Sequence, residues 1–248
     1  MKPESVNNEW RNFCKYVIQK NRYILTARWK KFTKEIISWA KKREHPYQKN
    51  TNLWRARIGS KIKVQTGDVK VGALKDKDLY MPPRNKSLEG RANPEGVPYF
   101  YLACEDTTAI YEVRPHRNQH VTVATFKLIK DVKVIDALSS PLLTVITKFA
   151  GKDNLSSAER EELIWAYINN AFSIPIAPED NHCDYVPTQY LAELFKNEGY
   201  DGVLYRSAIK QDGANVVLFD CNVAVIECKR VFSIKKILYE PQEVGLEL

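Results

Sequence analysis

Three residues in the middle of the chain have side chains suited to catalysis, and short segments separate them. Arg91 follows Gly90 in a turn that also contains Pro94, Tyr101 lies in the aromatic run after the turn, and Glu112 lies one element later. Glycine and proline reverse the backbone or let it approach a ligand closely. The sequence therefore predicts a turn, a strand and then a helix that carries Glu112.

The chemistry of these side chains is complementary. An arginine binds phosphate, a tyrosine packs against a ring, and a glutamate stabilises a positive charge that develops during a reaction. The pattern is therefore compatible with Arg91, Tyr101 and Glu112 converging on one cleft. Spacing alone leaves an alternative, in which they lie on a surface turn, a half-buried strand and a solvated helix.

The composition is typical of a protein with a real hydrophobic core. Of 248 residues, 44% are apolar and 27% are charged. No apolar run reaches the roughly 20 residues of a membrane span, and the first ten residues lack the apolar core of a signal peptide. The five cysteines include no C-x-x-C pair, which argues against a disulfide framework or a zinc site. We expect a cytoplasmic protein.

The positive charge is concentrated at the N-terminus. Residues 1–50 hold 13 Lys and Arg against 4 Asp and Glu, whereas the rest holds 25 against 26. Apolar stripes from Trp10 to Ile18 and from Trp29 to Ala40 predict two amphipathic helices there. A basic region suggests an acidic partner or nucleic acid, and a solvated helix face is the alternative. We predict that these helices pack on the main domain or on a partner and do not themselves carry catalysis.

The remaining pattern predicts an α+β domain. Residues 53–58 alternate as a strand with Arg55 and Arg57 on one face, which suits either an anion site or solvent. Residues 59–89 read as a long loop, with a possible hairpin near residue 67. Helices and strands follow, with two final strands at 223–226 and 231–238. We predict a basic helical extension over 1–50, a catalytic domain over 51–238 and a polar tail over 239–248.

His116 and His120 stand four residues apart, which is a spacing that helices use for metal ligands. Pro115 and the β pattern after residue 120 place both histidines on a loop, and no third ligand is near. We therefore expect no metal and no bound cofactor.

Three segments together resemble one protein family. They are Trp54-Arg55-Ala56-Arg57, the stretch from Gly90-Arg91 through Tyr101 to Glu112, and Tyr205-Arg206-Ser207-Ala208-Ile209 followed by Asn215. Their order and spacing are similar to the RES-domain toxins, NAD-degrading enzymes named for an Arg, a Glu and a Ser. The resemblance covers about residues 53–220. It implies an ADP-ribosyltransferase-like mixed β-sheet core with surrounding helices, loss of nicotinamide from NAD+, and control by a cognate antitoxin.

The resemblance also implies roles for individual residues. Arg91, Tyr101, Glu112 and Ser207 match the family's catalytic positions, while Arg55 or Arg57 matches a basic position that faces the ligand pocket. Asn215 belongs to the last matched segment and is expected to bind substrate. In this assignment Glu112 bonds a ribose hydroxyl, Arg91 grips the pyrophosphate, and Ser207 holds a phosphate or ribose oxygen.

Nicotinamide leaves NAD+ as a neutral base, so its departure needs no general acid and one carboxylate suffices. The expected function is therefore hydrolysis or phosphorolysis of the nicotinamide–ribose bond. An ADP-ribosyltransferase with a macromolecular target is the alternative enzyme. A non-catalytic nucleic-acid-binding module that uses the basic N-terminal helices is the alternative of another class. No G-x-G-x-x-G follows a strand, so nothing favours a Rossmann redox enzyme.

Overall fold

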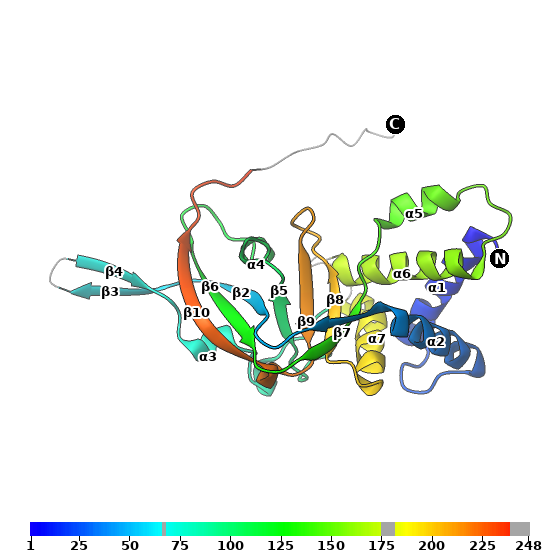
Figure 1. Ribbon diagram of the computed structural model, residues 1–248, viewed down its shortest axis with the longest axis horizontal. Coiled ribbons are helices and arrows are strands. Elements are labelled where there is room, and N and C mark those ends of the chain that lie inside the picture. The colour runs from blue at the N-terminus through cyan, green and yellow to red at the C-terminus, as the bar shows by residue number, and fades with distance from the viewer. Residues whose placement is uncertain (66–67, 175–181, 239–248) are drawn as a thin grey trace.

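The computed structural model describes residues 1–65, 68–174 and 182–238. Its centre is an eight-stranded sheet in the order β1-β7-β8-β9-β5-β2-β6-β10, and β3 and β4 form a separate hairpin (Figure 1). The strands are β1 (Glu44–Tyr47), β2 (Asn52–Ile58), β3 (Lys61–Gln65), β4 (Asp68–Gly72), β5 (Phe100–Ala103), β6 (His120–Leu128), β7 (Val132–Asp136), β8 (Gly202–Arg206), β9 (Ala214–Leu218) and β10 (Ala224–Ser233). Among these described strands, β7 and β8 alone pair in parallel.

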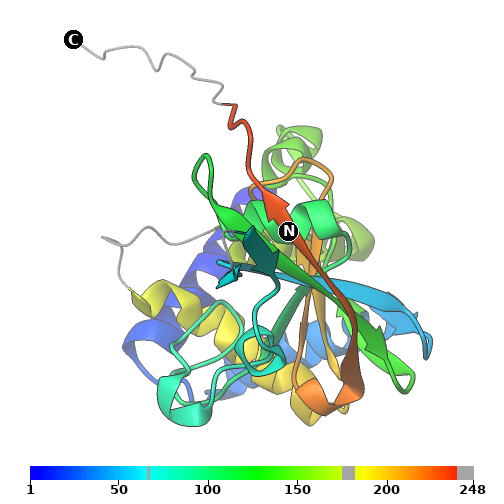
Figure 2. The ribbon, with the colours of Figure 1, turned by 90° about the vertical axis from the view of Figure 1, so that its left-hand side faces the viewer.

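Most of the helices gather at one end of this sheet. The described helices are α1 (Pro3–Gln19), α2 (Ala27–Ala40), α3 (Asp76–Leu79), α4 (Asp106–Glu112), α5 (Leu142–Phe149), α6 (Ser157–Ser173) and α7 (Val186–Asn197). In Figure 1, α1, α2, α6 and α7 lie beyond β8, whereas the β3–β4 hairpin projects at the opposite end. Figure 2 looks along the molecule from the hairpin end, with the strands in front of these helices. The predicted α+β class is confirmed.

The N-terminal stripes form the two helices that their periodicity predicts. Both helices bury their apolar side chains in the cluster that also contains residues of α6, α7 and β8. Arg160 on α6 ties them together, because its guanidinium is 2.9 Å from Glu9 on α1 and 2.9 Å from Glu35 on α2. The predicted domain boundary at residue 51 stays a prediction.

Local signals also fix the later helices. Ser156 and Glu159 form a capping box, in which each side chain accepts a hydrogen bond from the other's backbone N–H. Gly199 follows α7 with a φ of 86°, the left-handed conformation expected of a helix-ending glycine. No helix in the described ranges is long and apolar enough to cross a membrane.

Two parts of the strand pattern differ from the expectation. The predicted helical extension over 1–50 also contains a strand, β1, which joins the main sheet; Pro46 lies in it, because an edge strand tolerates the missing N–H. The two final strands are one continuous strand, β10, with a bulge between Ile226 and Cys228 that interrupts the alternation. The hairpin expected near residue 67 is present, with Gln65 opposite Asp68. Residues 239–248, the predicted tail, lie outside the described residues.

The sheet opens in its middle, and this opening positions the site. β2 pairs with β6 over seven residues and β5 pairs with β9 over four, yet β2 and β5 share the single pair Trp54–Ala103. The two strands therefore diverge beyond this pair. Side chains from β2 can enter the space between them, whereas a continuous ladder would close it.

Candidate functional site

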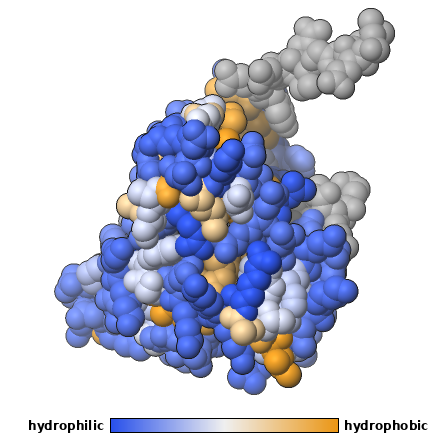
Figure 3. All heavy atoms as spheres, turned by 90° about the vertical axis from the view of Figure 1, so that its right-hand side faces the viewer, coloured by the Kyte–Doolittle hydropathy of each residue, from blue (hydrophilic) through white to orange (hydrophobic). Residues whose placement is uncertain are grey.

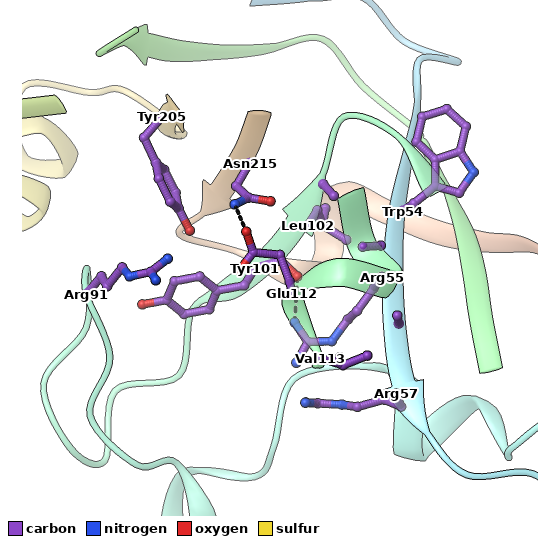
Figure 4. Close-up of a pocket in the computed structure, with 13 residues that line it drawn as sticks. Trp54, Arg55, Arg57, Arg91, Tyr101, Leu102, Glu112, Val113, Tyr205 and Asn215 are labelled. Carbon is purple, nitrogen blue, oxygen red and sulfur yellow. Dashed lines mark hydrogen bonds between the residues drawn. The ribbon is translucent and has the colours of Figure 1, made fainter. Parts of the chain in front are cut away.

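A cavity of about 280 Å³ lies where β2 and β5 diverge. Figure 4 shows side chains from both strands, from α4 and from β8 and β9 around it. Its lining residues are Trp54, Arg55, Ala56, Arg57, Arg91, Tyr101, Leu102, Ala103, Ala109, Glu112, Val113, Tyr205 and Asn215. Of the seven residues that the sequence nominates, six line this cavity. Ser207, the seventh, is buried and in contact with Glu112.

The Glu112 carboxylate is held at one oxygen by two donors. Ser207 Oγ donates to Glu112 Oε1 over 2.7 Å, and Asn215 Nδ2 donates to the same oxygen over 2.6 Å (Figure 4 shows the second bond). Oε2 makes no hydrogen bond to any described residue. One oxygen is thus fixed and the other remains for a ligand.

Ser207 is itself fixed by the loop that begins there. Its Oγ accepts from the backbone N–H groups of Ile209 and Lys210, over 3.2 and 3.1 Å. These two bonds leave the hydroxyl proton to point at Glu112. Gly213 closes the loop, because a Cβ there would lie 3.0 Å from Thr108 Oγ1 on α4. The loop after β8 and the helix that carries Glu112 therefore fit closely together.

Arg91 lies on a turn that distant side chains hold in place. Gln189 on α7 donates from Nε2 to the carbonyl oxygens of Gly90 and Asn93, over 3.1 Å in each case. Tyr101 Oη donates to Asn93 Oδ1 over 2.7 Å and accepts from the N–H of Ala92 over 3.0 Å. A Cβ on Gly90 would meet Tyr101 Oη at 2.8 Å, so only glycine fits this approach without displacement.

The charge of Arg91 is favoured by its surroundings. Burial acts to lower the pKa of Arg91, but the nearby Tyr205 hydroxyl and Glu112 carboxylate together hold that pKa above its ordinary value. In Figure 4 the guanidinium points toward the rings of Tyr101 and Tyr205 and the interior of the cavity. The turn therefore presents a permanent cation to the cavity.

Arg55 and Arg57 reach the cavity through the opening between β2 and β5. Arg55 is 8% exposed, and its Nη1 donates to the carbonyl oxygen of Tyr101 over 2.7 Å. Its Nε is buried without a partner, and neither arginine makes an ion pair with a described residue. Burial, and then the positive charge of Arg57, lower the pKa of Arg55 to about 9. Arg55 therefore remains protonated at neutral pH, and an anion beside the two arginines would relieve this electrostatic cost.

A family comparison matches this part of the chain. The model of the RES domain matches residues 53–237, which is most of the sequence. The chain belongs to the RES-domain family. No curated protein matches it.

A solved structure with a similar chain is the M. tuberculosis MbcT–MbcA toxin–antitoxin complex. The match has 15% sequence identity and a TM-score of 0.44, and it covers 81% of this chain and 92% of the other.

The cavity and its supporting contacts also include two residues that the sequence did not nominate. Tyr205 lines the cavity from β8, and burial raises its pKa to about 12, so its hydroxyl stays protonated at neutral pH. Gln189 holds the Arg91 turn from a helix almost a hundred residues away in sequence. Tyr205 belongs to the last segment that resembles the family, two residues before Ser207, so its position in the sequence offered a usable signal. Gln189 had none.

His116 and His120 have separate surroundings. His116 lies in a loop as predicted, but His120 is the first residue of β6 and not part of the loop, and its Nδ1 is 2.9 Å from Ser60 Oγ. The described residues hold no group of three His, Cys, Asp or Glu side chains that could bind a metal ion. The expectation that the site needs no metal or cofactor stays a prediction.

Proposed function

We propose that this RES domain is a toxin that cleaves the nicotinamide–ribose bond of NAD+, by hydrolysis or phosphorolysis. One observation carries the proposal. A single carboxylate, fixed at one oxygen by Ser207 and Asn215, lies in a cavity that three arginines also line. The family membership of the chain supports the same reaction class.

The single carboxylate suits the leaving group of this reaction. A glycosidase that cleaves an O-glycoside uses two carboxyl groups, because the departing oxygen must be protonated. Nicotinamide departs from a cationic precursor as a neutral base, and it needs no proton. Glu112 then has one task, which is to stabilise the positive charge that forms on the ribose ring in the transition state. Its Oε2 is the oxygen left to bond a ribose hydroxyl.

The arginines suit the other end of the substrate. The pyrophosphate of NAD+ carries two negative charges, and a guanidinium fork binds such oxygens in a bidentate manner. Arg91 approaches the cavity from its turn, while Arg55 and Arg57 approach from β2. We assign the pyrophosphate to these groups. The orphaned Nε of Arg55 supplies a buried donor that an anion would satisfy.

Tyr101 and Ser207 take more limited roles in this proposal. The Tyr101 hydroxyl is already bonded to Asn93 and Ala92, so the ring, and not the hydroxyl, is what it offers to a ligand. The Ser207 hydroxyl proton is directed at Glu112, so Ser207 orients the carboxylate in place of binding a substrate oxygen. Tyr205 adds a protonated hydroxyl beside Arg91.

The test is to incubate the purified protein with NAD+ and measure free nicotinamide. We expect release by the wild-type protein and very slow release by Glu112→Gln. Dependence of the rate on inorganic phosphate distinguishes phosphorolysis from hydrolysis. Labelled NAD+ added with a cell lysate detects the alternative, because a transferase would leave the label on a macromolecule. A folded wild-type protein that releases no nicotinamide in any of these conditions would refute the proposal.

We also propose that the protein acts in the cytoplasm and that a cognate antitoxin restrains it there. The support is the resemblance to RES-domain toxins, whose NAD+ consumption is damaging to the cell that makes them. Expression in a bacterium should lower cellular NAD+ and arrest growth, and Glu112→Gln should be tolerated. Growth arrest by the Gln variant at the same expression level would contradict this account.

A further inference from the structure

A second hollow lies away from the catalytic cavity, at the end of the molecule where the N-terminal helices pack on α7. It has a volume of about 500 Å³, and residues 23–25, α2 and α7 line it. We call it the α2–α7 groove. Its apolar surface comes from Leu25, Ile37, Tyr190 and Leu194. The face shown in Figure 3 is mostly hydrophilic, with an apolar patch near its lower edge.

The connection between α1 and α2 holds apolar side chains outward beside this groove. Tyr23 is 88% exposed and Ile24 is 70% exposed. Asn21 Oδ1 accepts hydrogen bonds from the backbone N–H groups of both residues, over 2.9 Å each, and Tyr16 Oη donates to the Ile24 carbonyl over 3.0 Å. Single exposed apolar residues are ordinary, but a fixed loop that adds two of them to an apolar hollow marks an interaction surface.

Two lysines set the charge of this surface. Lys30 and Lys34 line the groove one helical turn apart on α2, and neither makes an ion pair with a described residue. Like charges at this spacing repel each other, and carboxylates on a partner would relieve the repulsion. Glu198, the one acidic residue of the groove, lies just after α7. Residues 11–43 around the groove hold 11 Lys and Arg and one Glu.

We propose that the α2–α7 groove binds an acidic amphipathic helix of a partner protein. Apolar side chains on one face of that helix would enter the hollow beside Ile24 and Leu194. Glutamates or aspartates one turn apart on its flank would pair with Lys30 and Lys34. An apolar groove with two lysines at its edge suits such a helix, whereas nucleic acid binds to rows of cations that follow its phosphates.

The experiment measures binding of the full-length protein to a labelled synthetic helix by fluorescence anisotropy. The probe is an acidic peptide with leucines at i, i+3, i+4 and i+7 and glutamates elsewhere, and its partner peptide carries lysine at every glutamate position. We expect saturable binding of the acidic peptide in the micromolar range and at least about tenfold weaker binding of the basic one. No saturable binding of the acidic peptide, or equal binding of both, would overturn the proposal.

Variants of exposed groove residues locate the binding. Ile24→Glu and the double variant Lys30→Glu/Lys34→Glu should each weaken the acidic peptide at least about tenfold. Leu143→Glu on α5, where the side chain is 74% exposed, is the matched apolar control. Lys75→Glu/Lys77→Glu, on exposed residues at α3, is the matched charge control. Equal losses in the controls would overturn the proposal, because the binding would then be nonspecific.

Two further results would overturn the proposal, because they would assign the groove to nucleic acid or to a second copy of this chain. A duplex RNA that binds more tightly than the acidic peptide, and loses that binding in Lys30→Glu/Lys34→Glu, would assign the surface to nucleic acid. A concentration-dependent dimer of the free protein that Ile24→Glu abolishes would assign it to a second copy of this chain. Light scattering across a range of protein concentrations detects the dimer.

Discussion

The turn that carries Arg91 and the loop that begins at Ser207 both lie at the cavity between β2 and β5, and they are held in different ways. Gln189 and Tyr101 bond to backbone atoms and to Asn93, so they fix the shape of the turn. Ser207 and Asn215 instead bond to the carboxylate of Glu112, the group that we propose acts on the transition state. A group that must meet charge formed only in the transition state gains from being fixed beforehand. A group that grips the substrate throughout needs the right position and charge.

The largest expected effect concerns Glu112, the carboxylate that Ser207 and Asn215 hold. Glu112→Gln keeps the size of the side chain and its bonding to Asn215 but removes the charge. If Glu112 stabilises the transition state, kcat should fall about 10²–10³-fold, or about 3–4 kcal/mol, with little change in KM. Nicotinamide release measures both constants. The matched control is Glu95→Gln, an exposed residue of the Arg91 region, which should behave as wild type. A folded Glu112→Gln variant with the wild-type rate would exclude Glu112 as the catalytic carboxylate.

The next largest effect is expected for Arg91, which lies on the turn at the other side of the cavity. Arg91→Lys keeps the positive charge but replaces a planar fork with a point charge. We expect KM for NAD+ to rise about tenfold with kcat nearly unchanged, since the grip is the same in ground and transition states. Arg84→Lys, on an exposed residue before the turn, serves as the control. An unchanged kcat/KM for Arg91→Lys would show that Arg91 does not grip the substrate.

Ser207 and Asn215 donate hydrogen bonds to Glu112, and we expect both to affect kcat only through Glu112. Asn215→Ala removes one hydrogen bond to Oε1 and should lower kcat by about tenfold, which is within the range for a bond to a charged group. In the Glu112→Gln background the same change should have less than about a twofold effect, because the charge that Asn215 orients is gone. Ser207→Ala should follow the same rule. Independent, additive effects would mean that these residues act on the substrate directly.

The smallest effect is expected where a residue acts through the backbone of the turn. Gln189→Ala removes the donor to the Gly90 carbonyl oxygen and leaves the Asn93 carbonyl oxygen with the Gly90 N–H as its donor. A buried acceptor that loses its partner typically costs about 1–3 kcal/mol. We expect a lower melting temperature and a KM about threefold higher, with kcat preserved. Enzyme kinetics and thermal unfolding of the same sample provide the readings. A loss in kcat alone would place the turn among the groups that act in the transition state.

Local signals were sufficient for much of the fold. The capping box at Ser156, the glycine stop at Gly199 and the apolar stripes of α1 and α2 depend on neighbours within one or two turns of helix, so the sequence displays them directly. The bulge in β10 breaks the period-2 pattern, and the prediction of two strands failed there for that reason.

Features that depend on contacts between distant segments of the chain were harder to predict from the sequence. Arg55 and Arg57 were correctly placed on one face of β2, but the opening between β2 and β5 that admits them depends on pairing partners far apart in the chain. The bond from Gln189 to the Arg91 turn spans 99 residues and has no local signature. The residues with a matched family role were found by that resemblance, because their spacing alone favoured a surface turn, a half-buried strand and a solvated helix.

The short strand β1 has a consequence for how copies of this protein meet one another. β1 covers β7 at one edge of the sheet and carries Pro46, which has no N–H to offer to a further strand. β10 forms the other edge, where a bulge and the charged side chains of Lys229 and Arg230 interrupt its regularity. Both edges are thus poor templates for intermolecular β-pairing. A fragment that begins at residue 53, where the family match begins, would lack β1 and expose the edge of β7, and such a fragment should aggregate during refolding while the full chain does not.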